Sequence, residues 1–229
     1  MVGCVPDFVD ELAQVPLFAG LDAGALDVIA KRAFVRRLAR GQILFSEGEP
    51  SDHLFLVRSG RLRVFVASAR GDELVLSVIA PGETLGELSV LDRQPRSATV
   101  EALDAVELVA VPGDDVRALL ESNPAALHAV ALALATGMRR LSGTAADLVF
   151  LDLPRRLAKL LLAESQRSTD GRLTSQLAMS QTGVAARLGV TRQSLNKAMS
   201  ALAQRGWIVV EGTTVRIDDA DALTKFAES

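Results

Sequence analysis

The sequence predicts an α+β chain in which an antiparallel β-roll is followed by a long helix and then by a small helical module with a β-hairpin. Three observations predict this class. Short apolar segments separated by glycines fill residues 41–111, a helical apolar stripe runs to residue 151, and the charge balance changes sign just beyond it. With 229 residues, 49% of them hydrophobic, the chain is long enough for two modest domains with buried cores.

The first part of the chain is expected to be helical and then β-rich. Residues 8–40 place apolar side chains at helical spacing, which predicts short helices. Four short segments rich in Val, Leu, Ile and Phe follow: Leu54–Val57, Leu62–Val66, Leu74–Ile79 and Val106–Val111. Glycines recur near or between them, at Gly48, Gly60, Gly71 and Gly82. Regular short strands with glycine turns indicate a sandwich or barrel, and we expect an eight-stranded, jelly-roll-like β-roll.

A long helix is predicted after Asn123-Pro124. Its apolar residues alternate at spacings of three and four, and the expected dimer seam consists of Leu127, Val130, Leu134, Leu141 and Leu148. The stripe fits packing on the chain's own sheet or a parallel dimer, and its regularity favours the dimer. Pro154 ends this helix and can open the next one. The expected domains are residues 1–122, the dimerisation helix 123–152, and residues 153–229.

The last part of the chain predicts a winged helix-turn-helix. Ser180 and Thr191 are the expected N-caps of two helices joined by Gly189-Val190, and residues 207–217 indicate a hairpin wing. On the second helix, one stripe is apolar and the opposite face is polar and free of carboxylates, as reading base edges in a major groove requires. The candidate DNA contacts are Thr191, Arg192, Gln193, Ser194, Asn196 and Lys197.

Charge and rare residues narrow the function. Residues 152–217 hold 10 basic and 4 acidic side chains, against 14 and 20 in residues 1–151, so the basic segment is expected to meet an anion such as DNA. A single cysteine, Cys4, and two histidines, His53 and His128, exclude an internal disulfide, an iron–sulfur cluster and a His/Cys metal site. No apolar run reaches the ~18 residues of a membrane span, so we expect a cytoplasmic protein without a membrane partner.

Residues 82–100 carry the candidate ligand site. Gly86 lets the backbone approach a ligand closely, and a helical turn starting at Glu87 presents free N–H groups. Arg96 adds a cationic fork and Ser97 a hydroxyl, so an anionic phosphate would be well held. Glu87 beside a phosphate makes sense as the acceptor of a sugar hydroxyl. The alternative, an ordinary Glu87–Arg96 ion pair, explains neither the glycine nor the serine.

This segment, with Gly86-Glu87-Leu88 and Arg96-Ser97-Ala98, and the helix start Thr191–Ser194 resemble the cAMP receptor protein/fumarate-nitrate regulator (CRP/FNR) family of bacterial transcription factors. The resemblance covers nearly the whole chain. It implies a homodimeric transcriptional regulator, not an enzyme, controlled allosterically by a cyclic nucleotide, first of all cAMP, with no metal. A pseudo-palindromic operator DNA and RNA polymerase are the implied partners. The implied nucleotide contacts are Gly86, Glu87, Leu88, Arg96, Ser97 and Ser142.

Two positions depart from the cAMP-responsive pattern. Leu141 stands beside Ser142 where such relatives commonly carry threonine, and a leucine cannot hydrogen-bond an adenine amino group. Gln193 stands where they typically carry glutamate, which predicts adenine instead of cytosine at one base pair of the half-site. The nearest alternative keeps the fold but binds DNA without ligand or responds to another nucleotide. A distant alternative is a cupin-type β-barrel enzyme, which would need a His-rich metal cluster.

Overall fold

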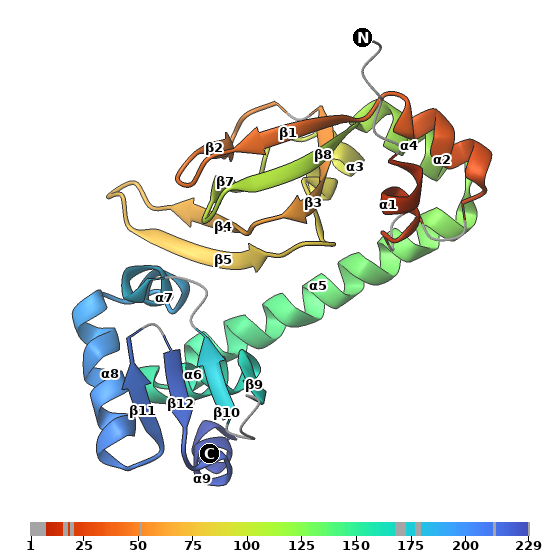
Figure 1. Cartoon of the computed structure of the whole chain (residues 1–229). Helices are drawn as coiled ribbons and strands as arrows, with labels where there is room; N and C mark the ends of the chain where they lie inside the picture. The colour runs from red at the N-terminus through yellow and green to blue at the C-terminus, as the bar shows by residue number, and fades with distance from the viewer. Residues whose placement is uncertain are drawn as a thin grey trace. The chain divides into compact units, whose positions relative to one another are not determined.

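The computed structural model describes residues 8–15, 18, 21–50, 52–167, 173–176, 180–212 and 214–228 (Figure 1). Cys4 lies outside the described residues. The chain divides into two compact units. The first comprises Met1–Val66 and Leu76–Met138, and the second comprises Ala67–Val75 and Arg139–Ser229.

Eight strands in two antiparallel sheets form the β-roll of the described residues (Figure 1). Their bounds are β1 (Phe34–Leu38), β2 (Ile43–Phe45), β3 (His53–Ser59), β4 (Leu62–Ala67), β5 (Glu73–Ile79), β6 (Thr84–Leu85), β7 (Thr99–Ala102) and β8 (Val106–Pro112). The sheets have the orders β1-β8-β3-β6 and β2-β7-β4-β5. The predicted β-roll is confirmed, and the four predicted segments lie within β3, β4, β5 and β8.

The helical prediction for residues 8–40 is only partly right. Helices α1 (Val9–Ala13) and α2 (Ala23–Ala30) form as expected, but Phe34–Leu38 is strand β1. This strand pairs antiparallel with β8, from Phe34 opposite Ala110 to Leu38 opposite Val106. Pairing with a buried central strand therefore overrides the local helical spacing, a tertiary effect that the segment itself does not encode.

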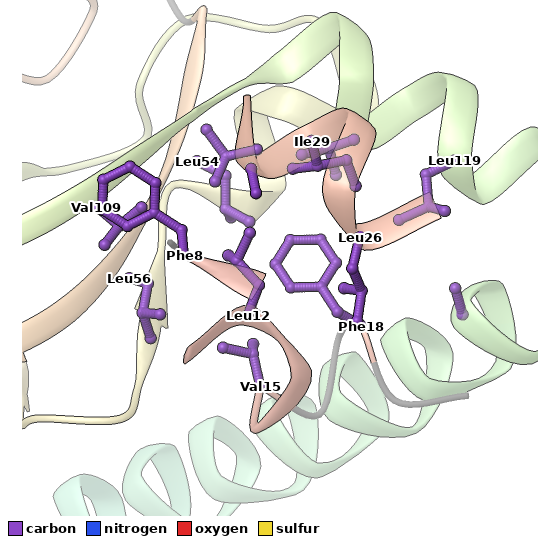
Figure 2. Close-up of a cluster of buried hydrophobic side chains, with 14 of the residues drawn as sticks. Phe8, Leu12, Val15, Phe18, Leu26, Ile29, Leu54, Leu56, Val109 and Leu119 are labelled. Carbon is purple, nitrogen blue, oxygen red and sulfur yellow. The ribbon is translucent and has the colours of Figure 1, made fainter. Parts of the chain in front are cut away.

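Strand β3 separates two hydrophobic cores because both of its faces are buried. Phe55 and Val57 face the interior of the roll. Leu54 and Leu56, on the other face, join the core formed with the helices, in which Phe8 and Leu26 are also buried (Figure 2). This alternation follows from the two-residue period of a strand, and it fixes the register of β3 from both sides.

Three helices follow or interrupt the strands: α3 (Glu87–Asp92), α4 (Gly113–Ser122) and α5 (Pro124–Phe150). The side chain of Asn123 accepts a hydrogen bond from the backbone of Ala126, which caps the start of α5. The first turns of α5 pack on the helical core, where Ala126 and Val130 are buried and Leu134 is partly buried. The break at Asn123-Pro124 agrees with the prediction.

The predicted dimer seam needs one correction. Val130 is 4% exposed, so it faces its own core and leaves no surface for a partner. Its place in the seam was wrong, because a three-four stripe looks the same whether it covers its own sheet or a second helix. Leu127, Leu141 and Leu148 are 53%, 61% and 47% exposed.

The second unit contains four helices and a four-stranded sheet among its described residues. The helices are α6 (Leu153–Ala163), α7 (Gln181–Arg187), α8 (Arg192–Gln204) and α9 (Ala220–Glu228). The strands are β9 (Ser165–Arg167), β10 (Leu173–Gln176), β11 (Ile208–Glu211) and β12 (Thr214–Ile217), in the order β11-β12-β10-β9. The predicted hairpin wing is β11 and β12, whereas β9, β10 and α9 were not anticipated.

An aromatic and cationic stack docks α9 against the rest of this unit. The rings of Trp207 and Phe226 have their centroids 5.2 Å apart. The guanidinium carbon of Arg205 lies 4.8 Å from each centroid, and that of Arg155 lies 5.6 Å from the Phe226 ring. Such cation–π contacts add to the apolar packing of α9, whose Leu223 is fully buried.

Candidate functional site

Gly86 forms the turn between β6 and α3. Its φ of 86° is left-handed, a conformation that glycine adopts at little cost. A Cβ at this position would lie 2.4 Å from Nη1 of Arg96 and 3.2 Å from the carbonyl oxygen of His53. Gly86 is therefore required twice, by its backbone angle and by the close approach of Arg96.

Arg96 is folded inward against the backbone of the candidate ligand segment, residues 82–100, which we call the cassette. It is 4% exposed; its Nη1 donates to the carbonyl of Gly86 at 3.1 Å and its Nη2 donates to the carbonyl of His53 at 2.7 Å. Its guanidinium carbon lies 4.1 Å from the ring centroid of Phe45. The remaining nitrogen, Nε, is buried without a hydrogen-bond partner among the described residues. A buried guanidinium with an unpaired donor is suited to receiving an anion.

Burial and neighbouring charges shift the pKa values of Glu87 and Arg96 in the cassette. Burial raises the pKa of Glu87 above its usual value, and a backbone N–H and the charge of Arg96 oppose this shift. Burial lowers the pKa of Arg96, and the nearby carboxylates of Asp52, Glu87 and Glu49 oppose that shift. Arg96 donates to backbone carbonyls rather than to Glu87, so the simple Glu87–Arg96 ion pair does not describe the site.

The remaining predicted ligand residues are more open. Leu88 and Ser97 are exposed, with Ser97 next to the buried Arg96 in the chain, and Ser142 is exposed on α5. The structure thus brings Gly86 and Arg96 into direct contact, with Glu87 next in the chain. Sequence reasoning missed His53, because it contributes a backbone carbonyl that any residue could supply. It also missed Phe45, whose ring packs under the guanidinium from a strand far away in sequence.

Helices α7 and α8 form the second candidate site. The predicted caps are confirmed: Ser180 accepts from the backbone of Gly183, and Thr191 accepts from that of Ser194. The hydroxyls of Thr191 and Ser194 also lie 3.0 Å apart. One stripe of α8 is buried, comprising Leu195, Ala198, Met199 and Leu202. This anchored stripe fixes which face of α8 points to solvent.

The solvent face of α8 is a hollowed polar surface. It is lined by Arg192, Gln193, Asn196, Lys197, Ser200, Ala201 and Gln204. Arg192 and Lys197 are exposed, and Nη2 of Arg192 lies 3.4 Å from the side-chain oxygen of Gln181 on α7. Because α8 holds no carboxylate, this face offers donors and amides to an anionic partner. The lining includes four of the six predicted DNA contacts, Arg192, Gln193, Asn196 and Lys197, and their role in binding DNA stays a prediction.

Within the described ranges, no group of three or more His, Cys, Asp or Glu side chains is placed to hold a metal ion. In the same ranges, no single helix is long and apolar enough to cross a membrane. The bent pair α4 and α5 passes that test only by length and composition.

Comparisons with known proteins match both units. Residues 35–123 match the cyclic nucleotide-binding domain model, and residues 155–226 match the Crp-like helix-turn-helix domain model. The chain is 32% identical over 219 residues to the CRP-like cAMP-activated global transcriptional regulator of Mycobacterium tuberculosis, covering 94% of this chain and 98% of that protein. It is 32% identical over 213 residues to the cyclic AMP receptor protein of Thermus thermophilus, covering 93% and 96%.

A solved structure agrees with the fold. The CRP-family transcriptional regulator TTHB099 of Thermus thermophilus aligns with a TM-score of 0.68 and 27% identity, over 85% of this chain and 97% of that one. These matches are to transcriptional regulators, so the cupin-type enzyme alternative is wrong, and the chain is not an enzyme. A cyclic nucleotide-binding domain followed by a Crp-like helix-turn-helix makes this chain a member of the CRP/FNR family of transcriptional regulators.

Proposed function

We propose that this protein is a homodimeric regulator whose binding to operator DNA is controlled by a cyclic nucleotide, with cAMP as the first candidate. The observation that carries the proposal is the inward-folded Arg96, which is in contact with Gly86 and has an unpaired Nε. Two relatives of 32% identity are described as a cAMP-activated regulator and a cyclic AMP receptor protein. Their ligand is therefore the first to test.

The cassette recognises a sugar phosphate through opposite charges. The phosphate accepts from Arg96, whose Nε is unpaired, and so adds a charge-assisted hydrogen bond to those that Arg96 already makes. Ser97, exposed beside it, donates its hydroxyl, and Leu88 covers the ligand from the exposed side of α3. Glu87 accepts a ribose hydroxyl, which holds its carboxylate in the charged form despite burial.

The residues expected near the base leave the choice of nucleotide base open. Ser142 can hydrogen-bond a base, but its neighbour Leu141 has no polar atom to pair with an adenine amino group. This substitution favours the second candidate, the same regulator responding to another nucleotide or binding DNA without ligand. Calorimetric titration of the nucleotide-stripped dimer with cAMP, and with cGMP as control, decides between them. Saturable cAMP binding supports cAMP control, whereas operator binding without cAMP binding supports the alternative.

Helix α5 supplies the dimer seam in this proposal. Since Val130 is buried, the seam keeps the four predicted leucines and adds exposed residues on the outer side of the helix. It consists of Leu127, Ala131, Leu134, Met138, Leu141, Ala145 and Leu148. These positions alternate strictly by four and three, as a parallel coiled coil requires. Leu141→Lys should dissociate the dimer in sedimentation, whereas Leu132→Lys, on an exposed leucine of the opposite side, should leave it intact.

The exposed face of α8 reads the operator in the major groove. Arg192 suits a guanine edge, Gln193 suits adenine, Asn196 and Lys197 add contacts, and the hydroxyls of Thr191 and Ser194 lie at the helix start. Selection of operators from a random pool should return adenine at the pair facing Gln193, and Gln193→Glu should move the preference toward cytosine. An unchanged consensus would contradict this role. RNA polymerase stays a predicted partner of the DNA-bound dimer.

A further inference from the structure

An ion pair crosses the bend between α5 and α6. The two helices are separated by Leu151 and Asp152 alone. Across this break, Nζ of Lys159 lies 2.6 Å from Oδ1 of Asp147, and both side chains are partly buried, at 41% and 31% exposed. The backbone of the break is also defined, because Leu151 donates to the carbonyl of Asp147 and Asp152 caps α6 by accepting from Arg155. The bend is thus held by contacts on both sides.

Asp147 is poorly placed for helix stability. It lies in the last turn of α5, where the partial negative charge of the helix end repels a carboxylate. A cation or neutral residue would suit this position better. The pairing with Lys159 offsets that repulsion, so the contact between the two helices is the physical reason for an acidic residue here.

Helix α6 also contacts the helix-turn-helix formed by α7 and α8. Nη1 of Arg156 donates to the carbonyl of Leu188 at 2.9 Å, at the turn between α7 and α8. At the other end of α6, Glu164 pairs with Arg187 in the last turn of α7. Leu157 and Leu161, on the apolar face of α6, are fully buried. Polar contacts at both ends and apolar packing between them thus join α6 to the helix-turn-helix.

We propose that the Asp147–Lys159 pair is a positioning contact that sets the angle between the long helix and α6, and so the direction in which each recognition helix is presented. Arg156 and Glu164 then carry that angle to α8. This inference rests on the proposed dimer on two half-sites. In such a dimer, the angle in each protomer determines the distance and phase between the two recognition helices.

Spacing between half-sites is the property this contact should control. A dimer with a fixed angle binds one spacing well and operators with one base pair inserted or removed poorly. Without the pair, each module samples a range of angles, and the preference for the right spacing should fall by about three- to fivefold, as expected for a partly buried ion pair in each protomer. Affinity for an isolated half-site should not change, because the α7–α8 surface is untouched.

The test compares full-length wild type with Lys159→Met, Asp147→Asn, and the charge-reversed double variant Asp147→Lys with Lys159→Asp. Lys225→Met, which removes an exposed cation on α9, is the control. Affinities are measured for a half-site and for palindromes of three spacings, with cAMP and without it. Reduced spacing preference in both single variants, recovery in the reversed pair and constant half-site affinity support the proposal.

General DNA electrostatics gives a different pattern. Removing a cation at Lys159 would weaken every operator, and removing an anion at Asp147 would strengthen every operator, so opposite shifts in the two variants would overturn the inference. Unchanged spacing preference would overturn it as well. If the wild-type protein binds one half-site as tightly as a palindrome, this result contradicts the proposed dimeric function and, with it, the inference that rests on it. The two failures are therefore distinguishable.

Discussion

The two candidate sites of this protein hold their cations in opposite ways. In the cassette, Arg96 is buried and already hydrogen-bonded to two backbone carbonyls. On α8, Arg192 and Lys197 lie on an exposed face. A small anion at Arg96 would meet a guanidinium held in a fixed geometry with its Nε unpaired, whereas DNA would meet long, exposed side chains on a helix. The first arrangement favours selectivity for one ligand shape, and the second favours rapid electrostatic capture followed by adjustment.

Removing the buried cation should have the largest effect. Arg96→Met removes the guanidinium donors to the carbonyls of Gly86 and His53 and the charge that meets the phosphate, so nucleotide affinity should fall by about 100-fold or more. Calorimetric titration measures the change, and Arg96→Lys keeps the charge if the methionine variant does not fold. Arg93→Met, at an exposed arginine nearby, should stay within about twofold of wild type. Equal losses in Arg93→Met and Arg96→Met would contradict the contrast between the buried and exposed cations.

The exposed cations of α8 should contribute less each. Arg192→Ala should lower affinity for the operator by about 10- to 100-fold while barely changing non-specific binding, because it removes a base-edge contact. Lys197→Ala should weaken binding to all sequences more evenly and reduce the slope of log affinity against log salt by about one. Lys225→Ala, on α9, is the control in the same fluorescence anisotropy titrations. An equal loss of operator affinity in all three variants would show that α8 acts only as a general basic surface and does not read base edges.

Two glycines with the same backbone angle isolate the role of the Arg96 contact. Gly86 and Gly82 have φ of 86° and 87°, but a Cβ at Gly82 would meet nothing within 4 Å. Both alanine variants should lose about 1 kcal/mol of unfolding free energy from the left-handed angle. Gly86→Ala should additionally displace Arg96 and lower nucleotide affinity by about tenfold. Equal nucleotide affinity in the two variants would show that the close approach is not needed.

Protonation of Glu87 should give the smallest effect. Because the pKa of Glu87 is raised by burial, the acid form appears at a higher pH than for an ordinary glutamate. A ligand hydroxyl needs the carboxylate, so nucleotide affinity should fall by about two- to threefold as the pH drops toward that pKa. Glu87→Gln should remove this pH step. Without ligand, acidification should have the opposite effect on the stability of the fold. The buried charge of Glu87 lowers the free energy of unfolding at neutral pH, and this cost disappears when the carboxylate is protonated.

The recognition helix could be predicted almost completely, but the cassette could not. The faces of α8 follow from a regular period. Ser180, the N-cap of α7, and Thr191, the N-cap of α8, each bond within four residues, so local sequence determines the faces and the caps. The inward fold of Arg96 depends on Phe45 and on the carbonyl of His53, which reach it only through the sheet. Neither contact leaves a pattern in the sequence.

The strands show the same limit. Strands β3 and β8 were predicted because both faces are apolar, which leaves long Val- and Leu-rich runs. Strand β6 has two residues and β2 has three, too few to show any period. The prediction for Val130 was wrong for a related reason. Its spacing fits the seam, but its burial depends on a core built from segments far apart in the sequence, such as Leu12, Leu54 and Leu119.

The stack around Trp207 has a practical consequence for optical measurements of unfolding. Trp207 is the only tryptophan in the sequence, and the sequence contains no tyrosine. Its indole contacts Arg205 and lies beside Phe226 of α9, so its environment depends on the docking of α9. Intrinsic tryptophan fluorescence of this protein therefore reports on the DNA-binding unit. Because the β-roll holds no tryptophan, this signal does not report its unfolding. A second optical signal, such as circular dichroism, would report both units, and the difference between the two melting curves would isolate the β-roll.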